Sequence, residues 1–155
     1  GDDRLAYLQI ALTGKGEPMV EKQGVLVLTG RQEAFAAAGP ATLRMRLRGV
    51  NAANSVLVNG VEVARMPADA KDGQRLETEV AAERLRRLNV IEVVSDKTAE
   101  GDKFDDFTVD SIDMVYDGKT FGDYRLPKAA WTTVKPQGDA PGKATFYVDL
   151  TLPEG

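Results

Sequence analysis

The sequence of 155 residues contains neither cysteine nor histidine. Disulfide bonds, thiol nucleophiles, the usual zinc sites and any catalysis built on an imidazole are therefore excluded. Aromatic residues are also scarce, because one Trp, four Tyr and five Phe make up only 6% of the chain. This scarcity argues against a binder of crystalline polysaccharide, which needs a broad platform of flat rings.

The few serine residues lack the surroundings of a catalytic nucleophile. None of Ser55, Ser95 and Ser111 lies in a Gly-x-Ser-x-Gly motif, and no histidine is present to activate them. No glycine-rich phosphate loop follows a predicted strand, and no pair stands out among the 24 acidic residues. We therefore expect a protein that is not an enzyme.

The net charge and the hydropathy of the chain limit the classes of partner that it can bind. The chain has 20 basic and 24 acidic residues, and its net charge of −4 argues against general nucleic-acid binding. No apolar run approaches the ~18 residues that a membrane-spanning helix needs, and no signal peptide is recognisable at Gly1. We expect a domain from a larger protein, with no membrane span of its own.

Hydrophobic residues repeat with a period of two along most of the chain, as in β-strands. In Leu43–Arg48, apolar side chains alternate with arginines, which predicts a strand with one buried and one solvated face. Asn59-Gly60 between two β-branched runs predicts a hairpin with a type I′ turn, because both residues tolerate positive φ. Further strands are predicted at Leu5–Leu12, Val25–Leu28, Leu76–Val80, Val90–Ser95, Phe107–Tyr116 and Ala144–Thr151.

The alternation changes phase once, inside the predicted strand Phe107–Tyr116. Val109 and Ile112 can both point inward only if one extra residue intervenes near Asp110-Ser111. A β-bulge supplies such a residue. With the bulge in place, we expect Asp113 to face water.

Turn residues separate the predicted strands at intervals typical of a β-sandwich. We therefore predict an all-β fold, a single jelly-roll-like antiparallel β-sandwich of about nine or ten strands that spans residues 1–155. The predicted core consists of inward-facing apolar residues: Leu43, Met45, Leu47, Val56, Val58, Ile91, Val93, Phe107, Val109 and Ile112.

Three segments in the middle of the chain resemble a known superfamily. Val56–Gly60 resembles a strand that ends in Asn-Gly, and Leu85–Val94 resembles a Leu-x-x-Gly-Asn-x-Ile element in which Leu88 replaces the usual glycine. Phe104–Met114 resembles a C-terminal strand that an acidic–aromatic pair precedes. These are features of galactose-binding-like jelly rolls, which include many carbohydrate-binding modules. The resemblance covers roughly residues 42–117.

The resemblance implies a non-catalytic carbohydrate-binding accessory module. By the same resemblance, the parent would be a bacterial protein that is secreted, periplasmic or on the cell surface. An alternative from another class stays open at this point. It is a structural or protein-interaction sandwich that packs against a neighbouring domain and binds no sugar.

An acidic segment, Asp96–Asp123, contains nine acidic residues and three lysines. Carboxylates are hard oxygen ligands that suit Ca²⁺, and Asp102, Asp105 and Asp106 lie together in the predicted loop before a strand. Jelly-roll modules often carry a structural calcium, and the resemblance implies that Asp105 or Asp106 is its C-terminal ligand. The alternative is that these carboxylates are solvated.

Four further residues are candidates for ligand binding. Arg44 and Arg46 could hold an acidic ligand, because a guanidinium binds carboxylate or phosphate in a bidentate manner. The alternative for them is pairing with acidic residues of a neighbouring strand. The rings of Trp131 and Tyr124 could pack on a sugar face, or they could belong to the core or its rim.

Overall fold

The structure is a computed structural model that describes residues 35–68, 74–99, 101, 103–123, 132–151 and 153. The chain divides into two units, Gly1–Phe35 and Ala36–Gly155, and every described strand belongs to the second unit. The strands predicted at Leu5–Leu12 and Val25–Leu28 lie outside the described residues. One domain over residues 1–155 stays a prediction.

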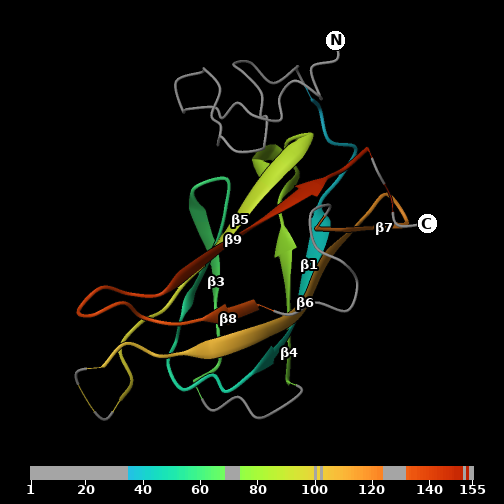
Figure 1. Cartoon of the computed structure of the whole chain (residues 1–155). Helices are drawn as coiled ribbons and strands as arrows, with labels where there is room; N and C mark the ends of the chain where they lie inside the picture. Colours follow the sequence, from blue (N-terminus) through green and yellow to red (C-terminus); the bar gives the residue numbers. More distant parts are fainter. Residues whose placement is uncertain are drawn as a thin grey trace. The chain divides into compact units, whose positions relative to one another are not determined.

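Two antiparallel sheets form the described part of the second unit (Figure 1). The first sheet has the order β4 (Gln74–Val80), β1 (Ala41–Arg48), β6 (Phe107–Tyr116) and β7 (Lys119–Gly122), and β8 (Thr132–Val134) also pairs with β6. The second sheet has the order β3 (Val61–Arg65), β2 (Ser55–Val58), β5 (Leu88–Val94) and β9 (Lys143–Asp149). The predicted all-β antiparallel sandwich is confirmed, with nine strands among the described residues.

The chain passes repeatedly from one sheet to the other. β1 belongs to the first sheet, β2 and β3 to the second, β4 to the first and β5 to the second. β6, β7 and β8 then extend the first sheet before β9 completes the second, an alternation typical of jelly-roll-like sandwiches. The described residues contain one short 3₁₀ turn, Ala82–Arg84, and none of their helical segments has the length and apolar character to cross a membrane.

The interior between the sheets contains all ten residues that were predicted for the core. They lie on inward faces because successive side chains of a strand point to opposite sides of its sheet. The prediction omitted several of the largest fully buried side chains, among them Met66 and Phe146. Phe146 follows the same alternation on β9, whereas Met66 comes after the end of β3, where the period of two no longer applies.

The predicted hairpin turn joins β2 to β3. Asn59 has a φ of 51° and Gly60 a φ of 87°, so both residues are left-handed, as a type I′ turn requires. Asn59 also ties the hairpin to β5. Its Oδ1 accepts a hydrogen bond from the backbone N–H of Val90 at 2.9 Å, and its own N–H donates to the Val90 carbonyl at 2.8 Å.

The substitution Gly60→Val should lower the free energy of unfolding by about 1–3 kcal/mol, because a β-branched side chain resists a positive φ. Urea or thermal unfolding of both proteins measures the difference. Gly39→Val is the matched control, because Gly39 has open space where a Cβ would lie and has no positive φ. An equal loss in the control would contradict the conformational explanation.

β6 contains the predicted bulge. On β1, Arg46 pairs with Ser111 and the next residue, Leu47, pairs with Val109, so that Asp110 is the extra residue. The inward-facing positions change parity at this point, which keeps apolar side chains in the core along the whole strand.

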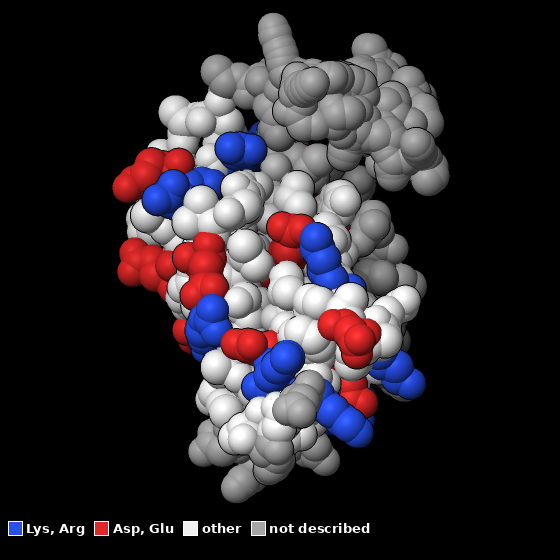
Figure 2. Space-filling model, turned by 90° about the vertical axis from the view of Figure 1, so that its left-hand side faces the viewer, with Lys and Arg blue, Asp and Glu red and all other residues white. Residues whose placement is uncertain are grey.

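The bulge also brings two carboxylates to the solvent-facing side, opposite the arginines of β1. Asp113 accepts a bidentate pair of bonds from Arg44, with Nε–Oδ1 at 2.7 Å and Nη2–Oδ2 at 3.1 Å. Asp110 does the same for Arg48, with Nε–Oδ2 at 2.9 Å and Nη2–Oδ1 at 3.0 Å. Figure 2 shows acidic and basic side chains interspersed on the face that it displays, so charge of one sign does not collect there.

Candidate functional site

A hollow of about 690 Å³ lies where the loop after β1, the loop before β6 and the loop before β9 meet. We call it the loop-end hollow. Its volume falls within the range of roughly 300–1,000 Å³ found for small-molecule pockets. Its walls include Asn51, Lys97, Lys103, Phe104, Asp106 and Asp139.

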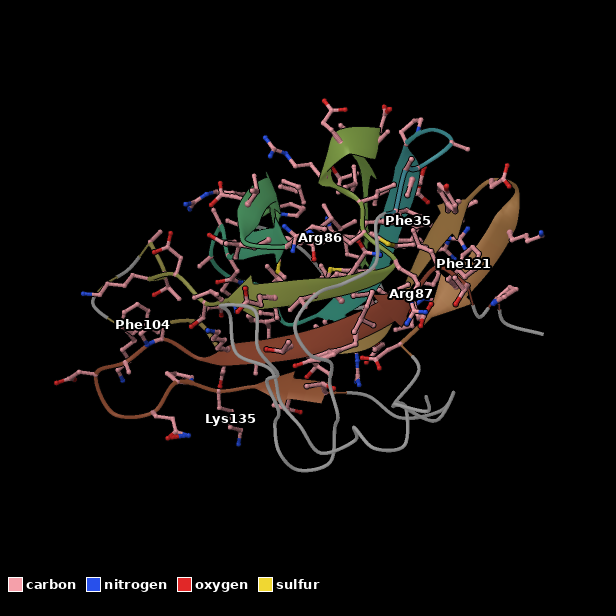
Figure 3. All side chains as sticks on the ribbon, turned by 90° about the horizontal axis from the view of Figure 1, so that it is seen from above. Phe35, Arg86, Arg87, Phe104, Phe121 and Lys135 are labelled. Carbon is pink, nitrogen blue, oxygen red and sulfur yellow. The ribbon has the colours of Figure 1, made fainter. Side chains whose placement is uncertain are left out.

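Phe104 provides the aromatic surface of the loop-end hollow (Figure 3). Its backbone forms an antiparallel bridge with Lys97, whose Nζ lies 5.3 Å from the centre of the Phe104 ring. An ammonium at this distance from a ring makes a favourable cation–π contact. The N–H of Thr98 donates to the Lys103 carbonyl at 3.0 Å, which holds the two arms of the loop together.

A buried polar bridge joins the loop after β1 to the loop before β6. Asp105 is 2% exposed, and its Oδ2 accepts hydrogen bonds from the Asn51 backbone N–H and from Asn54 Nδ2, both at 2.8 Å. Asn54 is itself fully buried, and its Oδ1 accepts a hydrogen bond from the Asp96 backbone N–H at 2.8 Å. Each of these buried polar groups has the partner that burial requires.

Arg65 braces the same two loops from the solvent side. Its guanidinium donates to the Ala53 carbonyl at 3.1 Å and to Asp96 Oδ2 at 3.0 Å. Hydrogen bonds from Arg65 and then from Ser55 lower the pKa of Glu62, and the bond to Glu62 raises the pKa of Arg65. Because these side chains are exposed, their ion pairs position the loops more than they stabilise the fold.

The loop before β9, the third wall, is fixed by Ser95 and Gly142. The Ser95 N–H donates to the Gly142 carbonyl at 2.9 Å, and the Gly142 N–H donates to Ser95 Oγ at 2.7 Å. A Cβ at position 142 would lie 2.7 Å from the backbone carbonyl of Lys135. Position 142 therefore requires glycine, because the two backbone segments approach so closely.

The predicted calcium ligands are only partly placed. Asp102 lies outside the described residues, Asp105 is buried with two N–H donors on its Oδ2, and Asp106 is exposed and lines the loop-end hollow. The described part of the chain holds no group of three or more acidic side chains arranged around one metal position. Calcium binding therefore stays a prediction.

The two predicted ligand-binding residues that the structure describes, Arg44 and Arg46, do not line the loop-end hollow. Trp131 and Tyr124 lie outside the described residues. Arg44 and Arg46 line a second, smaller hollow on the outer face of the first sheet. Phe104 was not among the predicted ligand-binding residues, although it begins the segment Phe104–Met114 that resembles the superfamily.

Together these observations define an all-β sandwich with a loop-lined hollow that combines one aromatic ring with charged side chains of both signs. No protein-family model, no curated protein and no solved structure matches the chain.

Proposed function

We propose that the chain is a non-catalytic carbohydrate-binding module of the galactose-binding-like jelly-roll type, which binds a sugar in the loop-end hollow. The observation that carries the proposal is an aromatic ring among hydrogen-bonding groups in an open hollow of about 690 Å³. A sugar has an apolar face that packs on a ring, and hydroxyls that need donors and acceptors. Phe104 supplies the ring, Lys97 and Lys103 supply donors, and Asp106 and Asp139 supply acceptors.

The walls of the hollow are held in place before any ligand binds. The Asp105–Asn54 bridge joins two of the loops, and the reciprocal hydrogen bonds of Ser95 and Gly142 attach the third loop to the end of β5. A site with fixed walls loses little conformational entropy on binding, which favours recognition of a small rigid ligand. By the resemblance, the parent protein is a bacterial protein exported from the cytoplasm.

Removal of the ring tests the proposal. The chain is first screened on a glycan array, once with added calcium and once with EGTA, and the strongest glycan is then titrated by calorimetry. Phe104→Ala should lower the affinity for that glycan by about tenfold or more. The reason is that a lost stacking contact is worth at least ~1.4 kcal/mol when its buried area is included. Phe104→Tyr keeps the ring and should keep the affinity.

Matched lysine variants locate the site. Lys97→Gln should lower the affinity for the same glycan. Lys135→Gln should leave the affinity unchanged, because Lys135 is exposed and does not line the loop-end hollow (Figure 3). If no glycan is retained on the array or in an affinity gel, the sugar proposal fails, and a structural or protein-interaction sandwich takes its place. If the Phe104→Ala variant binds the glycan with unchanged affinity, the glycan-binding site does not lie in this hollow.

A further inference from the structure

We propose that the outer face of the first sheet carries a second site, at which Arg46 and Arg75 bind a single oxyanion. The chemical class of the ligand group is a carboxylate or a phosphate on a small molecule. This inference goes beyond the proposed sugar site, because the two hollows have no lining residue in common.

The register of β1 and β4 places two positive charges opposite each other. Arg46 and Arg75 are direct cross-strand partners, and both are exposed. Among the described residues, no carboxylate forms an ion pair with either guanidinium. Like charges in directly opposed positions destabilise a sheet, and a bound anion would convert this repulsion into two favourable interactions.

The neighbouring carboxylates on β6 are already engaged. Asp113 directs both of its carboxylate oxygens to Arg44, and Asp110 directs both of its oxygens to Arg48. Arg44 and Arg48 stand on the same face of β1, two positions to either side of Arg46. The charge of Arg46 therefore lies between two positions that are each neutralised across the sheet.

The surroundings of Arg46 add a donor and a space of suitable size. Its other cross-strand partner is Ser111, which the bulge leaves exposed with a hydroxyl that can donate a hydrogen bond. Arg46, Arg75 and Ser111 line a hollow of about 210 Å³. This volume lies below the roughly 300 Å³ at which small-molecule pockets begin, so the hollow suits one charged group better than a whole sugar ring.

The charges of the residues that line the hollow indicate the charge of the ligand. Arg44, Arg46 and Arg75 contribute three guanidinium groups to the lining, and Glu77 and Asp113 contribute two carboxylates. The lining thus has a surplus of one positive charge, which matches one oxyanion and disfavours a polyanion. The planar fork of a guanidinium binds carboxylate and phosphate in the same bidentate geometry.

The experiment titrates the full chain with inorganic phosphate and, separately, with sodium glucuronate at constant ionic strength, with glucose as the neutral control. NMR spectra of the arginine Nε–Hε groups report binding at the guanidinium itself. We expect saturable shifts of the Arg46 and Arg75 signals with at least one of the two anions and none with glucose. The anion that acts more strongly identifies the ligand group as phosphate or carboxylate.

Four variants distinguish this site from non-specific attraction. Arg46→Gln and Arg75→Gln should each weaken anion binding by at least about tenfold, because the charge-assisted hydrogen bonds from one guanidinium are lost. Arg86→Gln removes the same charge from an exposed position before β5 and should leave the affinity unchanged. Arg75→Glu should raise the melting temperature of the anion-free protein and abolish the anion response, because it replaces repulsion by a cross-strand ion pair.

Two results would overturn the oxyanion site. One is the absence of saturable binding by both anions. The other is an equal loss of affinity in Arg46→Gln and Arg86→Gln, which would show general charge attraction. Neither result bears on glycan binding in the loop-end hollow, which depends on Phe104 and Lys97.

Discussion

Replacement of Leu47 by alanine should lower the free energy of unfolding by about 2–5 kcal/mol, because the change removes buried methyl groups and leaves a cavity. Leu47 is 0% exposed and lies on β1 at the centre of the first sheet, paired with Gln74 on one side and Val109 on the other. Strands on both sides limit how far the sheet can collapse into the space. Denaturant unfolding with a comparison of midpoints measures the loss.

Leu57→Ala is the matched control for this prediction, because it removes the same atoms from the outward, half-buried face of β2. Its cost should stay at or below about 1.5 kcal/mol, since less apolar surface leaves the protein interior. A Leu47→Ala variant that loses no more stability than Leu57→Ala would show that the inward and outward faces have been assigned the wrong way round.

Asp105→Ala should also be strongly destabilising, by about 2–5 kcal/mol. The substitution removes the carboxylate acceptor of the buried Asn54 Nδ2 and of the part-buried Asn51 N–H, and an unsatisfied buried donor costs about 1–3 kcal/mol. Besides the lost stability, hydrogen exchange of the Asn51 amide should become faster. Asp105→Asn keeps a carbonyl acceptor of similar shape and should recover part of the loss.

The neighbouring residue provides the control for Asp105. Asp106→Ala removes the same chemical group from an exposed position and should change stability by no more than about 0.5 kcal/mol in the absence of a metal. Equal losses at the two positions would mean that the Asp105 bridge does not contribute to folding as its geometry indicates.

Most of the sandwich could be predicted from local patterns. The period of two on β1 predicted the buried Leu43, and the Asn59-Gly60 pair predicted a left-handed turn. The bulge near Asp110 followed from parity alone, because Val109 and Ile112 cannot both face inward on a regular strand. Such features depend on residues within one strand or one turn, which a sequence displays directly.

The loop-end hollow could not be predicted in the same way. Its walls depend on contacts between residues far apart in the chain, such as Asn54 with Asp105 and Ser95 with Gly142. Polar residues in loops carry no periodic signal that distinguishes a buried partner from a solvated one. In the structure, Asp105 Oδ2 joins two loops through hydrogen bonds that no local pattern indicates, and calcium binding by Asp105 stays a prediction.

The bulge of β6 limits the ways in which this strand can mispair while the protein folds. A one-residue slip of a regular strand moves its whole apolar set to the other face, and the slipped state still offers a complete backbone ladder. The halves of β6 on either side of Asp110 have opposite parity, so any unbroken pairing with β1 exposes the apolar side chains of one half. Pairings of β6 with β1 in a shifted register are therefore less stable than the native one, which favours a single folded topology over competing states.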